Sequence, residues 1–240
     1  MLLLNHISIL ICTSVFIETK IKNFDIIMSM NRRTIIYVVR HGQAELNAKY
    51  TIGGTFEPNL LTAEGKKQAM ELAKNIENIK VDKIYSSDLS RARQTAEIIA
   101  SKKGMAIEIN KLLRERSWGS LQNKTFEKAK RMYPEAFEKE AKIQGQEAFK
   151  FRYVNDMESL EEAVSRFKRF LEIVASKQTG KIVLAVSHFD IIVGYLVDLG
   201  LGSYQELMNA KFNHAGYYTL IYRNGELKIG EIIGLNIHHL

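Results

Sequence analysis

The chain has 240 residues, of which 46% are hydrophobic and 25% are charged, a balance typical of a folded globular domain and not of a disordered chain. Lys and Arg number 34 against 27 Asp and Glu, giving a formal net charge of +7, yet the basic residues are interleaved with acidic ones, which argues against nucleic-acid binding. The single cysteine, Cys12, excludes an internal disulfide and a cysteine-based metal site, so we expect no metal and a reducing compartment.

The N-terminal segment differs from the rest because its apolar stretch is interrupted by polar residues such as Asn5, His6 and Ser8. A signal peptide would need a positively charged start and a small-residue cleavage site, and a membrane-spanning helix would need about 20 cleaner apolar residues. We interpret residues 1–29 as an extension outside the core and residues 30–240 as one domain. We expect a cytoplasmic protein without stable membrane association; membrane attachment or export through this segment is the alternative.

The first half of the domain alternates between strand and helix patterns. Its first apolar run is short, β-branched and apolar on both faces, as in a strand buried within a parallel sheet. Thr62 is a favourable N-cap for the amphipathic pattern that follows it, and Gly104 is a helix stop. The pattern predicts strand 34–39, helix 62–77, strand 81–85, a helix that starts at Asp88 and ends before Gly104, and strand 106–109.

In the second half, residues 124–150 are rich in Lys and Glu with scattered aromatic residues, which predicts helices or an irregular cap over one end of the sheet. A clear helical stripe and another buried strand follow. The dipeptide Asn224-Gly225 between two alternating runs is a strong hairpin signal. The elements predicted here are helix 159–176, strand 181–186, a helix from about 190 to 199, and hairpin strands 215–222 and 227–233.

Together these elements predict an α/β fold in which strands and helices alternate and a hairpin adds an antiparallel edge. The fold class is therefore a three-layer α/β/α sandwich around a mostly parallel, mixed sheet. No internal repeat or Pro/Gly-rich linker divides the chain, so we expect a single domain.

Two of the predicted buried strands each deliver a histidine at their carboxyl end, His41 and His188. In open α/β sheets ligands bind beyond those ends, where helix N-termini attract anions. Arg40 precedes the first histidine, and Arg91 lies in the first turn of the helix after a third strand. Basic groups therefore converge on one edge of the sheet, where a phosphate group could sit.

Five segments occur in an order and spacing that are recognisable. They resemble the histidine phosphatase superfamily, in its phosphoglycerate-mutase-like branch, over roughly residues 34–235. This resemblance implies a phosphoglycerate mutase-like fold and the transfer of a phosphoryl group. The segments are Arg40-His41-Gly42, Leu60 to Ala69, Ser86 to Glu97, Leu113 to Gly119 and Ser187-His188.

The resemblance implies that His41 is the nucleophile and forms a phosphohistidine. A neutral imidazole nitrogen is a competent nucleophile near physiological pH, and the transferring group needs fixed donors on several sides. The phosphate pocket of the family corresponds to Arg40, Asn47, Arg91 and His188. Guanidinium groups suit this role because they stay charged and donate two hydrogen bonds to one phosphate.

By the same resemblance Glu115 protonates the leaving oxygen and then takes a proton from water. A carboxyl group in a partly buried pocket beside a phosphate would have a raised pKa, as this role requires. The alternative is a surface glutamate that forms ordinary ion pairs with Arg114 and Arg116. We favour the catalytic interpretation.

Other polar residues receive structural interpretations. Arg93 lies about 200° around the helix from Arg91 and is expected at the surface. His214, just before the hairpin, is expected to be structural. The trio Ser187, His188 and Asp190 suggests a catalytic triad, but no Gly-x-Ser-x-Gly elbow is present and neighbouring strand residues face opposite ways. We reject the triad.

The sequence departs from the family at Phe189-Asp190, where the second histidine is usually followed by Gly. Segment 121–124 lacks the Gly and Leu of the corresponding mutase run, and segment 149–157 lacks the proline-rich, paired-arginine stretch with which mutases seal their site. We therefore expect a phosphomonoesterase acting on a small phosphorylated metabolite, without a cofactor. A cofactor-dependent phosphoglycerate mutase is the alternative, followed by a phosphate-binding module without turnover.

Overall fold

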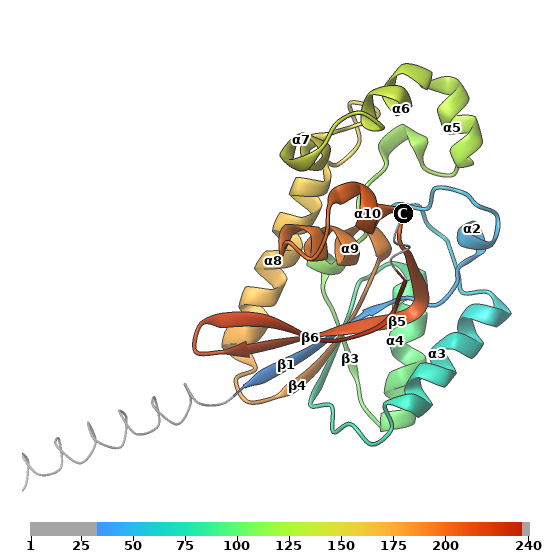
Figure 1. The fold of residues 1–240 in the computed structure, drawn as a ribbon. Coiled ribbons are helices and arrows are strands. Elements are labelled where there is room, and N and C mark those ends of the chain that lie inside the picture. Colours follow the sequence, from blue (N-terminus) through green and yellow to red (C-terminus); the bar gives the residue numbers. More distant parts are fainter. Residues whose placement is uncertain (1–32, 237–240) are drawn as a thin grey trace, which may run out of the picture.

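The computed structural model describes residues 33–236, so the predicted extension 1–29, Cys12 and the last four residues lie outside the described part of the chain. Six strands form one sheet in the order β3-β2-β4-β1-β5-β6 (Figure 1). The first four of these run parallel, and β5 and β6 add an antiparallel edge. The strands are β1 (Thr34–Arg40), β2 (Lys83–Ser86), β3 (Ile107–Ile109), β4 (Ile182–Ser187), β5 (Lys211–Arg223) and β6 (Glu226–Asn236).

The central strand β4 illustrates why these apolar runs form buried strands. Val183 and Ala185 belong to one hydrophobic core, whereas Leu184 and Val186 belong to a second core on the opposite face. All four are fully buried. Successive side chains in a strand point to opposite faces, so a run that is apolar at every position needs a layer on both sides.

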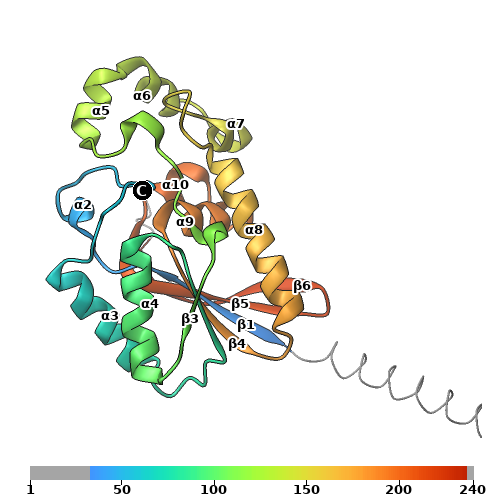
Figure 2. The same cartoon turned by 180° about the vertical axis from the view of Figure 1, so that it is seen from behind.

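Helices supply those two layers, as the two views show (Figures 1 and 2). The helices α3 (Ala63–Asn75) and α4 (Ser90–Lys103) pack on the core that contains Leu184. The helices α8 (Leu160–Lys177) and α9 (Phe189–Asp198) pack on the other core. The predicted three-layer sandwich with a mostly parallel, mixed sheet is confirmed.

Three predicted helix boundaries rest on capping chemistry. The Thr62 side chain accepts a hydrogen bond from the Gly65 N–H at 3.0 Å and caps the start of α3. Ser159 and Glu162 form a capping box at the start of α8. Gly104 adopts a left-handed conformation with φ 62° and ends α4, as expected of a glycine stop.

The start of α4 was predicted at Asp88, but the helix begins two residues later at Ser90, after an N-cap residue, Leu89, that gives no side-chain hydrogen bond. Asp88 instead accepts a bidentate pair of hydrogen bonds from Arg114, at 2.7 and 2.6 Å. The Asp88 side chain is therefore engaged in a bidentate ion pair with Arg114 and does not cap the helix.

Residues 124–150, predicted as helices or an irregular cap, contain three short helices above one end of the sheet: α5 (Phe126–Met132), α6 (Pro134–Glu140) and α7 (Gly145–Lys150) (Figure 1). A small separate core lies beneath them. Its buried members are Ile52, Trp118, Leu121, Ala129 and Met157.

Two short helices were not predicted, α2 (Glu45–Ala48) and α10 (Tyr204–Met208), with two 3₁₀ turns at Lys111–Leu113 and Gly119–Leu121. None of the helices within residues 33–236 has the length and apolar character needed to cross a membrane.

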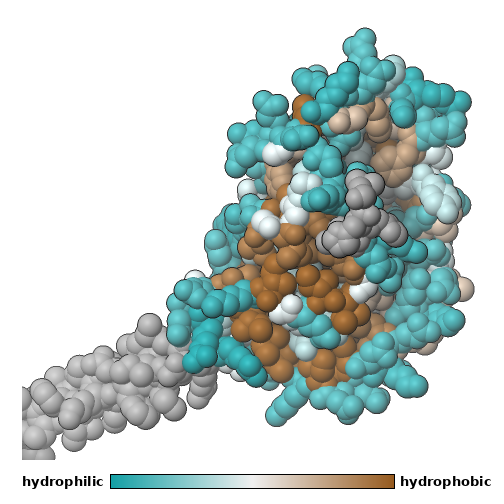
Figure 3. Space-filling view, in the orientation of Figure 1, coloured by the Kyte–Doolittle hydropathy of each residue, from teal (hydrophilic) through white to brown (hydrophobic). Residues whose placement is uncertain are grey.

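The β5–β6 hairpin is longer than predicted, and its turn uses Asn224 and Gly225 with φ values of 54° and 82°. Positive φ at both positions is the geometry that favours Asn-Gly in hairpins. Hydrophobic residues gather over this part of the sheet in the space-filling view (Figure 3), where Ile233 is 44% exposed. This edge is therefore less covered than the centre of the sheet.

Candidate active site

The two histidines predicted at strand ends lie side by side. Parallel pairing of β1 with β4 places Arg40 opposite Ser187, and the His41 N–H donates to the Ser187 carbonyl at 3.1 Å. The next residues, His41 and His188, consequently have ring centroids 5.0 Å apart. The register of the sheet thus brings together residues that are 147 positions apart in the chain.

Hydrogen bonds fix which nitrogen of His41 carries the lone pair. Its Nδ1 lies 2.7 Å from the Gly42 carbonyl, which can only accept, so Nδ1 carries the proton. The Nε of Arg91 donates to His41 Nε2 at 3.1 Å. Burial, followed by the charges of Arg91 and Arg40, holds the pKa of His41 well below its usual value of 6.5. The ring is therefore neutral at physiological pH, and its Nε2 carries the lone pair that accepts the hydrogen bond from Arg91.

The loop after His41 is packed tightly against the start of α3. A side chain on Gly42 would bring its Cβ to 2.4 Å from the Gly65 carbonyl oxygen, so only glycine fits there. The Gly42 N–H also donates to the hydroxyl of Thr95 at 3.0 Å, and that hydroxyl donates to the Arg91 carbonyl at 2.8 Å. One threonine on α4 thus joins the histidine loop to the arginine.

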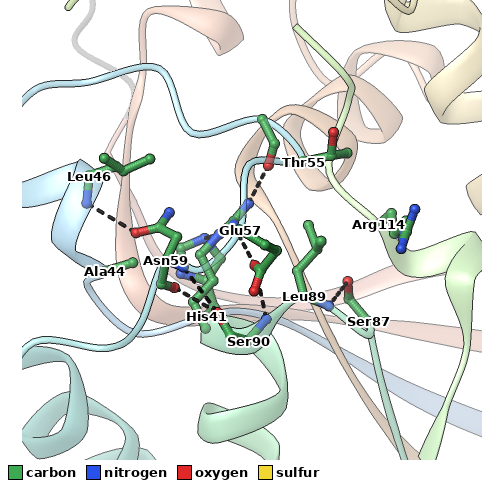
Figure 4. A network of polar contacts seen from close by, with 12 residues as sticks. His41, Ala44, Leu46, Thr55, Glu57, Asn59, Ser87, Leu89, Ser90 and Arg114 are labelled. Atoms are coloured by element: carbon green, nitrogen blue, oxygen red, sulfur yellow. Dashed lines mark hydrogen bonds and ion pairs between the residues drawn. The ribbon is translucent and has the colours of Figure 1, made fainter. Parts of the chain in front are cut away.

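Arg91 lies in the first turn of α4, and its Nη2 donates to the Gly54 carbonyl at 2.7 Å. Its Nη1 is buried without a hydrogen-bond partner in the described residues. Figure 4 shows Glu57 and Asn59 beside the start of α4, where the Glu57 carboxylate accepts from the Ser90 N–H at 3.1 Å and the Asn59 carbonyl accepts from the Ser90 hydroxyl at 3.0 Å. These contacts fix the helix end that carries the arginine.

Arg40, predicted in the phosphate pocket, lines the cavity, but both of its terminal nitrogens contact residues of β5 that do not line it. Its Nη1 donates to the Phe212 carbonyl, its Nη2 lies 3.1 Å from His214 Nε2, and its guanidinium lies 4.9 Å from the centre of the Phe189 ring. Burial lowers the pKa of Arg40 to about 10, which leaves it charged at neutral pH.

His214 was expected to be structural, and the structure places it at the edge of the site. Its ring centroid lies 6.0 Å from that of His41. Burial and the charge of Arg40 lower the pKa of His214 to about 3, so it accepts from the guanidinium as a neutral ring. The sequence contains no local signal that would bring it here, since the contact depends on β5 lying next to β1.

His188 is completely buried, and neither ring nitrogen has a hydrogen-bond partner among the described residues. Burial, followed by the charge of Arg91, holds its pKa well below 6.5. Buried polar atoms in proteins are nearly always hydrogen-bonded. A ring with two unpartnered nitrogens, next to His41 and Arg91, is therefore prepared to contact a bound molecule.

Glu115 is buried at 7% exposure, and both of its carboxylate oxygens accept backbone hydrogen bonds, from the Arg116 N–H at 2.9 Å and the Asp190 N–H at 3.3 Å. Burial, with a contribution from the Asp190 charge, raises the pKa of Glu115 to about 7. The alternative of a surface glutamate paired with its neighbours is wrong. Arg114 instead pairs with Asp88, and Arg116 pairs with Asp190.

The structure supports the rejection of a Ser-His-Asp triad. The Ser187 hydroxyl donates to the Leu113 carbonyl at 2.8 Å. The Asp190 carboxylate accepts from Arg116 Nε and from Trp118 Nε1, both at 2.9 Å. Asp190 therefore fixes the segment that follows Glu115.

Of the four predicted phosphate ligands, Arg40, Asn47 and Arg91 line a cavity of about 470 Å³ at the carboxyl end of the sheet, together with His41 and Glu115. The fourth, His188, is fully buried next to His41 and is not one of the lining residues. Asn47 is one of the lining residues. Its Oδ1 accepts a hydrogen bond from the Ala44 N–H at 3.0 Å, and its amide NH₂ is the group that can donate to a ligand. Arg93 lies outside the cavity in an exposed pair with Glu97, as expected. No cluster of three or more His, Cys, Asp and Glu residues within 33–236 could hold a metal ion.

Sequence reasoning missed three supporting residues. Thr95 and Asp190 lie within or next to the recognised segments, so their position was a signal that could have been followed. No sequence pattern pointed to Arg166, which lies on α8 and donates to the carbonyls of Arg114 and Glu115, at 2.5 and 2.9 Å. It therefore holds the loop that carries the acid.

Comparison with known proteins gives consistent results. The sequence model of the histidine phosphatase superfamily (branch 1) matches residues 36–232. A protein of Escherichia coli named Probable phosphoglycerate mutase GpmB is 32% identical over 196 residues, covering 76% of this chain and 84% of that protein.

Two solved structures show the same fold. Phosphoglycerate mutase from Bacillus anthracis is similar with a TM-score of 0.75 and 22% identity, covering 86% of this chain and 95% of that one. A mycobacterial glucosyl-3-phosphoglycerate phosphatase is similar with a TM-score of 0.69 and 21% identity, covering 85% and 100%. At these identities the likeness concerns the fold alone.

Proposed function

The chain belongs to the histidine phosphatase superfamily, branch 1, and from this membership and the geometry of its site we propose that it is a phosphomonoesterase that hydrolyses a small phosphate ester through a phosphohistidine. The observation that carries the proposal is the state of His41. It is buried and neutral, its Nδ1 proton is held by the Gly42 carbonyl, and its Nε2 is directed toward Arg91 in the cavity.

In the first half of the reaction, Nε2 of His41 attacks phosphorus, the P–N bond forms, and the P–O bond to the alcohol breaks. Arg40, Arg91, Asn47 and neutral His188 donate hydrogen bonds to the phosphoryl oxygens. Fixed donors in a buried site stabilise the charge that spreads over these oxygens in the transition state. The single N–H of neutral His188 and Nη1 of Arg91, which have no hydrogen-bond partner among the described residues, would each gain an acceptor at this stage.

Glu115 supplies the proton to the departing alcohol oxygen. With a pKa raised to about 7, a large share of its carboxyl groups is protonated at neutral pH. In the second half, the resulting carboxylate takes a proton from water, which attacks phosphorus and breaks the P–N bond. Phosphate leaves, and both His41 and Glu115 return to their starting protonation states.

Phosphoglycerate mutase is the second candidate because a relative carries that name. Hydrolysis is favoured because the segment 149–157 lacks the stretch with which the mutases seal their site, so water would reach the phosphohistidine.

The test is phosphate release from p-nitrophenyl phosphate and a panel of natural monoesters, without added metal, by the full chain and by its His41→Ala form. We expect release that the substitution abolishes, and a phosphohistidine that is trapped by rapid acid-free quenching in the unsubstituted protein alone. Activity retained by His41→Ala would overturn the mechanism. Interconversion of phosphoglycerates without phosphate release would identify a mutase, and binding without turnover a phosphate-binding module.

A further inference from the structure

The cavity extends beyond its phosphate-binding end into an outer half with aromatic walls. The Tyr153 ring stacks on Trp118, with centroids 5.6 Å apart and planes at 18°, and contacts Phe137 at 4.4 Å. The Phe126 ring contacts the Trp118 ring edge-on, with centroids 5.8 Å apart. All four rings line the same cavity. Such surfaces pack well against flat or apolar groups, so the part of a substrate beyond its phosphate meets rings.

One carboxylate of this outer half forms no ion pair with any residue that the structure describes. Glu140 ends α6 and lines the cavity together with Tyr153 and Tyr204, and, after burial, its carboxylate contributes to the raised pKa of both tyrosine hydroxyls. Burial raises the pKa of Tyr204 to about 12, so its hydroxyl stays a neutral donor at physiological pH. Neutral donors orient a carboxylate but leave its negative charge uncompensated.

The cations that line the cavity are committed to other groups. Arg116 pairs with Asp190 at 2.9 Å, and its guanidinium lies 4.6 Å from the centre of the Trp118 ring. Arg40 and Arg91 lie at the phosphate end, against His41 and its surroundings. The charge of Arg116, the arginine beside Trp118, is therefore balanced by Asp190, whereas the charge of Glu140 is not balanced by an ion pair with any described residue.

We propose that the outer half of the cavity selects a flat or apolar alcohol that carries an ammonium group, so that the preferred substrates are phosphate monoesters of such amino alcohols. This rests on the proposed phosphatase function. The ammonium group binds Glu140 between the tyrosine hydroxyls and takes no part in the P–O cleavage, in which the alcohol oxygen still receives its proton from Glu115. A leaving group with a carboxylate, such as that of 3-phosphoglycerate, faces Glu140 and is disfavoured.

The test uses three esters with matched leaving groups: tyramine phosphate, para-propylphenyl phosphate and para-(carboxyethyl)phenyl phosphate. Their kcat/KM values are measured with the full chain, and their Kd values with its His41→Ala form by calorimetry. Since a charge-assisted hydrogen bond is at stake, we expect the amine to be favoured over the neutral ester by about tenfold, and the carboxylate to be the poorest of the three.

Glu140→Gln in both backgrounds should remove most of the preference for the amine, whereas Glu138→Gln, an exposed carboxylate on the same helix, should preserve it. Equal kcat/KM and Kd for the three esters, or a preference that survives Glu140→Gln, would overturn the proposal. The calorimetry separates a failure of the phosphatase function from a failure of the proposed selectivity. If no ester is hydrolysed but the order of binding holds, the phosphatase function fails and the selectivity stands.

Discussion

Glu115 is the side chain whose protonation state sets the alkaline limit of the proposed reaction. Its pKa is raised to about 7, and the acid form is needed to protonate the leaving alcohol. Because the pKa of His41 lies well below 6.5, this histidine stays neutral through the same range. We predict that kcat/KM for an alkyl phosphate falls as pH rises above about 7, as Glu115 loses its proton.

Asp190→Asn tests the cause of this limit. The asparagine can still accept hydrogen bonds from Arg116 and Trp118, but the negative charge that helps raise the pKa of Glu115 is gone. The alkaline limb of the pH profile should then move to lower pH. A limb that does not move, in a variant with unchanged melting temperature, would contradict this assignment.

The proton donated by Glu115 matters in proportion to the basicity of the leaving group. For Glu115→Gln we predict that kcat/KM for an alkyl phosphate falls by about a hundredfold or more, the usual range for a lost general acid. For p-nitrophenyl phosphate the loss should be much smaller, because nitrophenolate leaves without a proton. Steady-state assays on both esters check this, and an equal loss on both would contradict the acid role.

At the scale of single residues, the recognised segments predicted where His41, His188, Arg91 and Glu115 would gather. They did not predict the contacts of His214, since its place depends on strand pairing and not on any neighbouring motif.

The helix α4 acts as the element that aligns the site, because Thr95 links the histidine loop to the turn that carries the arginine. For Thr95→Val we predict a loss of about 1–3 kcal/mol in the free energy of unfolding, since the Gly42 N–H would be left buried without an acceptor. The activity should fall as well, because Gly42 follows His41 directly.

Thr95→Ser keeps the hydroxyl and serves as the matched control. It should retain most of the activity and stability that valine loses. Urea unfolding and kcat/KM measured on the same preparations check both effects. A valine variant as stable and active as the serine variant would contradict the linking role of this hydroxyl.

Among the elements, those with a periodic apolar pattern and a chemical cap were predictable, as α3 and α8 illustrate through Thr62 and Ser159. The helices α2 and α10 were not, because four or five residues are too short to show a period. The helix α4 starts two residues later than predicted, because the Asp88 side chain pairs with Arg114 and does not cap the helix.

At the scale of the whole molecule, the mostly parallel sheet with an antiparallel edge could be predicted from the alternation of strand and helix patterns and from the hairpin signal. The order of the strands and the outer half of the cavity could not. The walls of the cavity's outer half come from the segment before the cap, the cap itself, the segment after the cap and α10, represented by Trp118, Phe137, Tyr153 and Tyr204 respectively. Contacts between such distant segments depend on how the cap sits on the sheet, and no local pattern encodes them.

Trp118 is the sole tryptophan of the chain, and it lies between the cap, the helix α9 and the cavity wall. It belongs to the core beneath the cap, its indole N–H donates to Asp190 on α9, and it stacks on Tyr153 in the cavity wall. We predict that its fluorescence emission and the far-ultraviolet circular dichroism change at the same urea concentration, because this indole ties the cap to the sheet. An earlier fluorescence transition would mean that the cap unfolds first.

The same placement gives the protein a built-in optical signal. A ligand that enters the outer half of the cavity must touch or displace the rings around this one fluorophore, so its emission intensity will follow occupancy during a titration. Dissociation constants of unlabelled esters can therefore be measured by titration of the intrinsic Trp118 fluorescence, at protein concentrations well below those that calorimetry needs.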